Sequence, residues 1–226
     1  MPIVERWRVI REQIDSATKA SGRELSAVEL LAVSKTYPSE VIAEVIAAGQ
    51  RSLGENRVQE ALEKMPQLED EISWHLIGPL QRNKVRKVVG KFACLQGVDS
   101  LKLAQTIDRV AGELGIVQSI FLQVKVGGEE TKSGFEFSEL TAQMDSLCLL
   151  SNLRIGGLMT IPPPVFEPEE ARPYFAQTRE FRDQLETSSG LKLSQLSMGM
   201  SGDYEGAIAE GSTMVRIGSA IFGRRV

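Results

Sequence analysis

Residues 29–38 read ELLAVSKTYP, and this stretch decides how the rest of the chain is interpreted. The apolar run from Leu30 to Val33 is typical of a buried strand. The run ends at Ser34 and Lys35, just before the turn-forming Pro38. Burying an ammonium group is costly, so a lysine at the end of such a strand needs a reason. That reason depends on the fold to which the strand belongs.

Apolar runs and helical patterns alternate along the remainder of the chain. The predicted strands are 30–35, 52–55, 73–78, 92–98, 119–126, 153–161, 195–200 and 214–222. The predicted helices are 3–20, 39–48, 57–68, 80–90, 100–114, 138–148, 169–187 and 203–210. Strands that alternate with helices pair in parallel through crossover helices.

Eight strand–helix repeats favour a single (β/α)8 TIM-type barrel of the α/β class over residues 1–226, preceded by an extra N-terminal helix. A chain of 226 residues is an ordinary length for one such domain. An open doubly wound sheet is the alternative, because periodicity does not show whether a sheet closes. No GxGxxG motif follows the first strand, which argues against that alternative.

Composition excludes several classes of protein. Hydrophobic residues make up 42% and charged residues 25% of the chain, as in globular proteins. The net charge of −4 predicts no nucleic-acid partner. The sequence has no apolar run of membrane-spanning length, and its charged N-terminus is unlike a signal peptide, so we expect a cytoplasmic protein. The two cysteines, Cys94 and Cys148, lack metal-ligand spacing, and we expect no metal site.

The barrel accounts for the position of the lysine. In such barrels the functional face is built from the carboxyl ends of the strands and the loops that follow them. Lys35 ends the first predicted strand and Asn56 follows the second. His75, the only histidine, lies on the third strand, and Arg216 lies on the eighth. The unusual polar groups therefore converge on one end of the predicted barrel.

The loops after strands seven and eight often bind phosphate in this fold. Here Ser201 and Gly202 precede a short predicted helix, whose first N–H groups suit an anion. On strand eight, Gly218 permits a close approach of the backbone and Ser219 adds a hydroxyl. The alternative is that Ser201 or Asp203 only caps the helix and Gly218 only relieves crowding.

A lysine facing a phosphate site suggests pyridoxal 5′-phosphate (PLP), which carries an aldehyde for the amine and a phosphate for the loops. Arg216 is placed to face the pyridine nitrogen. Because arginine only donates hydrogen bonds, that nitrogen would stay neutral and the cofactor would be a weak electron sink. A different phosphorylated aldehyde or sugar is the alternative ligand.

Several longer motifs resemble the YggS/PROSC family of pyridoxal-phosphate-binding proteins from about residue 29 to residue 225. The motifs are AVSKTYP, GENRVQEA, WHLIGPLQRNK, LMTI, SMGMSGDYEGAI and VRIGSAIFGRR. The resemblance implies a barrel like the N-terminal domain of alanine racemases, without their second domain. It also implies a role in vitamin B6 and amino/keto-acid homeostasis, with no established enzymatic activity.

The same resemblance assigns roles to individual residues. Lys35 matches the lysine that holds PLP as a Schiff base, and Asn56 matches the residue against the cofactor ring. Arg216 matches the group facing the pyridine nitrogen. The phosphate site comprises Ser201, Gly202, Gly218 and Ser219. His75 is included in the site, although a buried, hydrogen-bonded histidine near the cofactor is favoured over direct contact.

Other basic residues are interpreted more simply. Residues 82–87 form a basic helix face, which is either solvated surface or an anion-attracting rim. In the loop KVGGEETKSGF, Lys125 and Lys132 are further amines, and Lys132 is a candidate second acceptor for the aldehyde.

Three functions remain open. The favoured one is a monomeric protein that holds PLP and releases it to PLP-dependent apo-enzymes. The second is a small PLP-dependent racemase or lyase, which needs an acid or base opposite Lys35. In two-domain racemases a tyrosine of the second domain supplies it, whereas this chain offers only Tyr37, Tyr174 and Tyr204. The third is a signalling or scaffold protein. We therefore predict no catalytic residue and no enzymatic activity.

Overall fold

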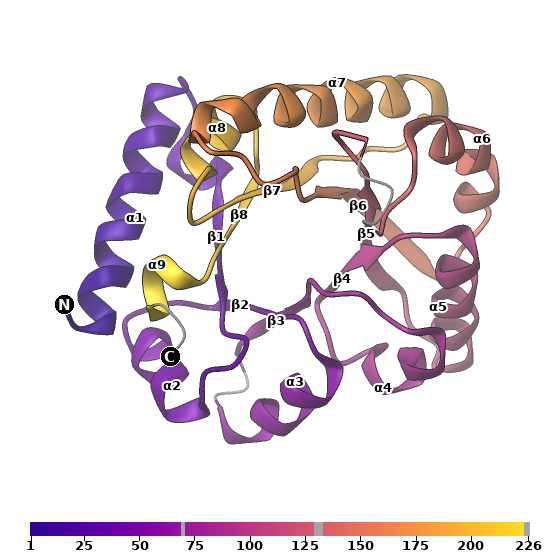
Figure 1. Cartoon of the computed structure of the whole chain (residues 1–226). Helices are drawn as coiled ribbons and strands as arrows, with labels where there is room; N and C mark the ends of the chain where they lie inside the picture. The colour runs from indigo at the N-terminus through magenta and orange to yellow at the C-terminus, as the bar shows by residue number, and fades with distance from the viewer. Residues whose placement is uncertain (69–70, 129–132, 224–226) are drawn as a thin grey trace.

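A computed structural model describes residues 1–68, 71–128 and 133–223. Its eight parallel strands close into a barrel in sequence order, with helices outside (Figure 1). The strands are β1 (Glu29–Val33), β2 (Ser52–Glu55), β3 (Ser73–Leu76), β4 (Cys94–Val98), β5 (Gln118–Val124), β6 (Leu153–Thr160), β7 (Gln195–Met200) and β8 (Met214–Ile217).

The pairing of the first strand with the last confirms the closed barrel. Leu31 of β1 lies opposite Arg216 of β8, and Ala32 of β1 lies opposite Leu53 of β2. An open doubly wound sheet would leave two edge strands unpaired, so that alternative was wrong. The carboxyl ends of all eight strands therefore surround one mouth.

The helices agree with the predicted pattern except in residues 80–90 and at α9, which was not predicted. They are α1 (Ile3–Ala20), α2 (Ser39–Ala47), α3 (Val58–Lys64), α4 (Val85–Val88), α5 (Leu101–Glu113), α6 (Phe137–Cys148), α7 (Arg172–Ser189), α8 (Tyr204–Ala209) and α9 (Ser219–Phe222). The predicted helix 80–90 is instead a 3₁₀ turn, Arg82–Lys84, followed by the short α4, and Gly90 at φ 80° follows it.

The eighth predicted strand was too long. It was expected to reach residue 222, but β8 ends at Ile217 and the chain turns into α9. Gly218 leaves the extended conformation at φ −114° and ψ −80°. Its carbonyl accepts hydrogen bonds from the N–H groups of Ile221 and Phe222, which closes a helical turn at the barrel mouth.

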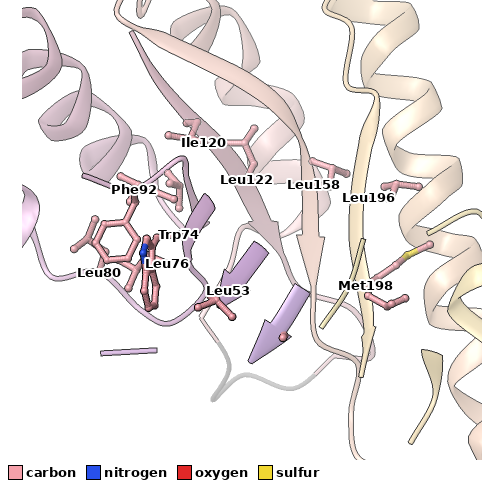
Figure 2. Close-up of a cluster of buried hydrophobic side chains, with 14 of the residues drawn as sticks. Leu53, Trp74, Leu76, Leu80, Phe92, Ile120, Leu122, Leu158, Leu196 and Met198 are labelled. Carbon is pink, nitrogen blue, oxygen red and sulfur yellow. The ribbon is translucent and has the colours of Figure 1, made fainter. Parts of the chain in front are cut away.

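The main core lies between the strands and the helices. Every second residue of a strand points outward, and these positions carry large apolar side chains. Figure 2 shows this layer, with Leu53, Trp74, Leu76, Ile120, Leu122, Leu158, Leu196 and Met198. The N-terminal helix α1 buries Ile3, Ile10 and Ile14 and packs against α8 and α9.

The alternate strand positions point into the barrel and are of two kinds. Five of them form a small apolar cluster: Leu31, Cys94, Phe121, Met159 and Met214. Others are polar and buried, including His75, Gln96, Ser197 and Arg216. Side chains thus fill the middle of the barrel, and a cavity lies at its carboxyl end.

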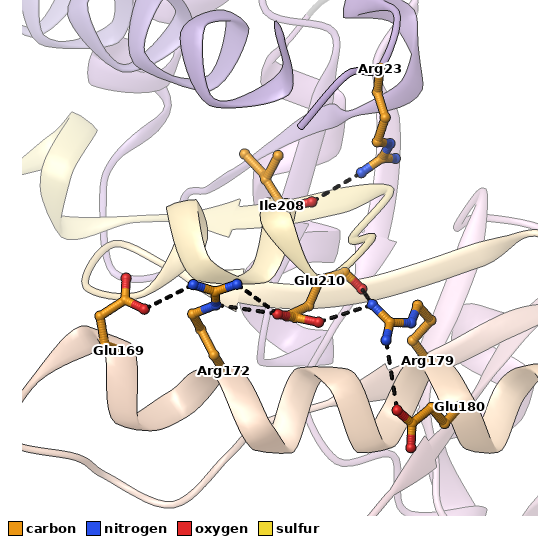
Figure 3. Close-up of polar contacts among 7 residues, drawn as sticks. All are labelled: Arg23, Glu169, Arg172, Arg179, Glu180, Ile208 and Glu210. Atoms are coloured by element: carbon orange, nitrogen blue, oxygen red, sulfur yellow. Dashed lines mark hydrogen bonds and ion pairs between the residues drawn. The ribbon is translucent and has the colours of Figure 1, made fainter. Parts of the chain in front are cut away.

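An ionic cluster fastens α7 to the turn between α8 and β8 (Figure 3). Glu210 in that turn pairs with Arg172 and with Arg179, each at 2.9 Å.

Among the described residues, no helix is both long and apolar enough to cross a bilayer.

Candidate ligand-binding site

One cavity of about 310 Å³ lies at the carboxyl mouth of the barrel. Seven of the eight predicted site residues line it: Lys35, Asn56, Ser201, Gly202, Arg216, Gly218 and Ser219. His75 does not line it. The cavity volume is within the range of small-molecule sites. Residues from β1, β2, β7 and β8 therefore meet as the barrel rule predicts.

Lys35 and Asn56 form one wall of the cavity. Lys35 follows β1 on the inward-facing side, two residues after Val33, which also lines the cavity. Asn56 follows β2, and the loop after β3 packs closely on its backbone. A Cβ atom at Gly78 would lie 2.2 Å from the carbonyl oxygen of Asn56. Only glycine allows this approach, which fixes the backbone of Asn56.

The opposite wall is built by the loops after β7 and β8. Ser201 Oγ accepts a hydrogen bond from the N–H of Ala220 at 3.4 Å, which joins the two loops. Asp203 does not cap α8 with its side chain; its Oδ1 accepts from the N–H of Met200 at 2.6 Å. Gly199, at φ 94°, allows β7 to pack on α8, since a Cβ there would lie 2.6 Å from Ala207 Cβ.

These loops present backbone donors to the cavity. Among the described residues, neither the N–H of Gly202 nor that of Ser219 is hydrogen-bonded within the protein. Ser219 begins α9, where the first N–H groups have no partner inside the helix. With the hydroxyls of Ser201 and Ser219, they make a donor set suited to an anion.

Arg216 forms the base of the cavity and is buried. Its Nη1 donates to the carbonyl and the hydroxyl of Ser197, at 2.5 Å and 2.8 Å, and its Nη2 donates to the carbonyl of Thr160 at 2.8 Å. Burial lowers the pKa of Arg216 to about 10, and the charge of Asp203 opposes that fall. The guanidinium therefore remains cationic at neutral pH.

A hydrogen-bonded chain runs from Arg216 into the barrel. Ser197 Oγ donates to Gln96 Oε1 at 2.6 Å, and Gln96 Nε2 lies 2.8 Å from His75 Nδ1. Because the Gln96 amide donates, Nδ1 accepts and Nε2 carries the proton toward Ser73 Oγ at 3.2 Å. Burial lowers the pKa of His75 to about 4. His75 is thus a neutral interior residue beneath Arg216, as the preferred interpretation expected.

Tyr37 is the one tyrosine that lines the cavity. Its hydroxyl donates to the carbonyl of Gly223 at 2.7 Å, and its ring stacks on Phe222 with centroids 4.9 Å apart. The Tyr204 hydroxyl instead lies 3.0 Å from Gln13 of α1. Among the described lining residues there is no aspartate, glutamate, histidine or cysteine.

Sequence reasoning missed some of the cavity wall. Ile77 and Ile161 end strands that were predicted, so the barrel rule could have found them, whereas Tyr37 was considered only as an acid or base. Gly223 could not be found, because α9 was not predicted.

The remaining lysine predictions have separate outcomes. Lys125 lines an adjoining cavity of about 220 Å³ and pairs with Glu136 at 3.2 Å. Lys132 lies outside the described residues. In the basic segment, Arg86 pairs with Glu113 on α5, and both side chains are exposed.

A family model and curated relatives both match this chain over nearly its whole length. A model of the alanine racemase N-terminal domain family matches residues 9–226. The pyridoxal phosphate homeostasis protein of Aquifex aeolicus (strain VF5) is 45% identical over 226 residues, covering 100% of this chain and 99% of that protein.

Solved structures agree with this match. PipY of Synechococcus elongatus PCC7942, determined with PLP bound, has a TM-score of 0.88 at 42% identity, covering 98% of this chain and 100% of that one. An alanine racemase of Clostridium difficile 630 has a TM-score of 0.73 at 19% identity. The match covers 95% of this chain and 56% of the racemase chain, and it shows a shared fold alone.

Proposed function

Because the chain belongs to the alanine racemase N-terminal domain family and has full-length relatives named pyridoxal phosphate homeostasis proteins, we propose that it binds PLP and serves in vitamin B6 and amino/keto-acid homeostasis. The observation that carries the proposal is one cavity lined by an amine, a buried guanidinium and two loops that present backbone and hydroxyl donors. PLP presents an aldehyde, a ring nitrogen and a phosphate, so the donor set fits the cofactor.

Each wall of the cavity has a role in this proposal. Lys35 holds the aldehyde carbon, and Asn56 lies against the ring. Ser201, Gly202, Gly218 and Ser219 hold the phosphate through hydroxyl and backbone donors. Arg216 faces the ring nitrogen, and its Nε makes no hydrogen bond with a described residue. When bound, the cofactor supplies an electrophilic carbon and an electron-withdrawing ring.

We propose that the protein holds the cofactor without turning over amino acids. Racemisation needs an acid or base on each side of the reacting carbon. Apart from Lys35, Tyr37 is the only candidate among the described lining residues, and its proton is donated to the Gly223 carbonyl. Arg216 is a cation that only donates hydrogen bonds, so it would not protonate the ring nitrogen. A neutral ring nitrogen makes the cofactor a weaker electron sink.

Release of PLP to apo-enzymes completes the proposal. The cavity lies at an open barrel mouth, where water would reach a cofactor held by Lys35 and could release it. We place the protein in the cytoplasm as a monomeric single-domain carrier of PLP. Cys94 and Cys148, neither of them in a disulfide, are consistent with a reducing compartment.

Absorbance titration tests the binding. Addition of PLP should give a visible band that saturates at one equivalent, and Lys35→Ala should lose this band. Lys125→Ala is the matched control and should keep it. A protein that binds another phosphorylated aldehyde or sugar would give no such band with PLP.

Isotope exchange tests the absence of turnover. The PLP-loaded protein is incubated with L-alanine in deuterated water, and exchange at Cα is followed. We expect no sustained exchange, but we expect reactivation of an added PLP-dependent apo-enzyme. Exchange near ~1 s⁻¹, the low end of ordinary enzymes, would restore the racemase alternative.

A further inference from the structure

A buried ionic cluster lies behind the turn that carries Lys35. Glu55, the last residue of β2, is fully buried and points outward from the barrel to α3. Lys64, at the end of α3, is also buried, and its Nζ lies 2.8 Å from Glu55 Oε1 and 2.6 Å from Glu60 Oε1. We call Glu55, Glu60 and Lys64 the clamp.

The clamp contacts the residues on both sides of Lys35. Before the lysine, Ser34 Oγ donates to Glu55 Oε1 at 2.7 Å, and Lys64 Nζ donates to the Ser34 carbonyl at 2.9 Å. After the lysine, the N–H of Thr36 donates to the carboxylate of Glu60. Three charged side chains thus hold the backbone from which Lys35 projects.

The turn needs such support because its backbone is strained. Thr36 has φ 72°, and it is the only non-glycine residue with positive φ in the described part of the chain. A β-branched residue in this region is unfavourable and persists only where its surroundings impose it. The hydrogen bond from Thr36 to Glu60 imposes it here.

The clamp also reaches the other residue of the same cavity wall, since Glu55 directly precedes Asn56. Burial raises the pKa of Glu55, and hydrogen bonds from Lys64 and Ser34 oppose the rise. For Glu60 burial also acts upward, but hydrogen bonds from Lys64 and Thr36 outweigh it, and its pKa lies below the usual value. Among the described residues, Glu55 Oε2 is buried without a hydrogen-bond partner.

Stability alone does not account for this arrangement. A buried ion pair seldom stabilises a fold more than apolar side chains of the same size. The three charged groups converge on the Ser34–Thr36 turn and not on a structural contact elsewhere in the barrel.

We propose that Glu55, Glu60 and Lys64 are positioning residues, which hold the Ser34–Thr36 turn so that Lys35 is oriented to attach PLP. This proposal rests on the proposed function. It predicts that loss of the clamp slows covalent attachment while noncovalent binding through the phosphate and ring persists.

Two ligands separate these effects. PLP reports attachment through its absorbance band, whereas pyridoxine 5′-phosphate lacks the aldehyde and reports noncovalent binding by calorimetry. The main variant is Glu55→Gln/Lys64→Met, which removes the two buried charges together and so leaves neither of them without its partner. Glu60→Gln is a milder variant on a partly exposed side chain. Gln118→Met, a buried polar residue at the opposite end of the barrel, is the matched control.

We expect the double variant to attach PLP about 10- to 100-fold more slowly, the loss typical of a misplaced reacting group. Its affinity for pyridoxine 5′-phosphate should stay within about threefold of the wild-type value, which is well below a tenfold change. Glu60→Gln should fall between wild type and the double variant, and Gln118→Met should match wild type.

The outcomes separate the two proposals. Unchanged attachment in both clamp variants would overturn the positioning role while leaving PLP binding intact. Equal loss for both ligands, or an equal loss in Gln118→Met, would make the clamp merely structural. If wild type attached no PLP but bound pyridoxine 5′-phosphate, the assigned role of Lys35 would fail first.

Discussion

Two buried polar networks reach the cavity from different sides, and they satisfy charge in different ways. The clamp lies outside the barrel, where Lys64 is neutralised by Glu55 and Glu60. The second network, from Arg216 through Ser197 and Gln96 to His75, lies inside the barrel. Among the described residues, the cation of Arg216 donates hydrogen bonds to the neutral oxygens of Ser197 and Thr160 alone. Behind them, Gln96 and His75 are neutral as well.

This difference indicates what each network is for. Paired charges fix a backbone turn firmly, but each member depends on the others. A cation that donates to neutral oxygens keeps its charge directed at the cavity, because in the described part of the chain no carboxylate forms an ion pair with it. Removing a charge from the clamp should therefore lower the stability of the fold strongly. The network from Arg216 to His75 should lose stability mainly when His75 is protonated.

Lys64→Met should have the largest effect on stability. It leaves Glu55 buried without a cation, and breaking a buried pair in this way costs about 3–5 kcal/mol. The free energy of unfolding, measured by urea denaturation, should fall by that amount. Glu55→Gln/Lys64→Met should recover most of it. If the single and double variants were equally unstable, the carboxylate of Glu55 would not be the cause.

The second largest effect should be the loss of stability in acid, through His75 in the network beneath Arg216. Because the folded state lowers the pKa of His75 from 6.5 to about 4, the unfolded state binds more protons between these values. The pH-dependent contribution of His75 to the free energy of unfolding, about 3 kcal/mol, is complete above pH 6.5 and is lost as the pH falls toward 4.

NMR gives the direct measurement, since His75 is the only histidine and its ring resonance needs no assignment. His75→Gln should flatten the dependence of stability on pH in this window. Titration of the ring near pH 6.5 would contradict the buried, neutral state.

Ser201→Ala should affect ligand affinity and leave both networks intact. A hydrogen bond to a charged group contributes about 1.5–3 kcal/mol, so PLP should bind about tenfold more weakly or worse. Pyridoxal, which has no phosphate, should barely respond. Equal weakening for the two ligands would mean that Ser201 only joins the two loops through its contact with Ala220.

Glu210→Gln should have the smallest effect. Figure 3 shows its ion pairs with Arg172 and Arg179. Both arginine side chains are partly exposed. Water and salt screen such pairs. The melting temperature should fall less than in Lys64→Met, and the difference from wild type should shrink in about 1 M salt. A loss as large as that of Lys64→Met would contradict the contrast between buried and exposed pairs.

Much of the architecture was predictable because alternating periodicities report which faces are buried. All eight strands were placed, and strand ends that carry Lys35 and Arg216 pointed to the mouth. Helix α9 was not predicted, because the apolar residues after Gly218 also fit a strand, and only the hydrogen bonds to its carbonyl decide between them.

The clamp was not predictable. Glu55 and Lys64 are nine residues apart, and the sequence reads them as the end of a strand and the surface of a helix. Only packing of α3 on β2 buries both. The strain at Thr36 is equally invisible in the sequence, since threonine gives no signal for positive φ.

The most direct test of the central claim is to reduce the PLP-loaded protein with borohydride and locate the adduct by peptide mass mapping. The cavity geometry predicts one adduct, on Lys35. An adduct on Lys64 would mean that the clamp opens to the ligand. An adduct on Lys125 would place the aldehyde in the adjoining cavity, and either result would contradict the assignment of Lys35.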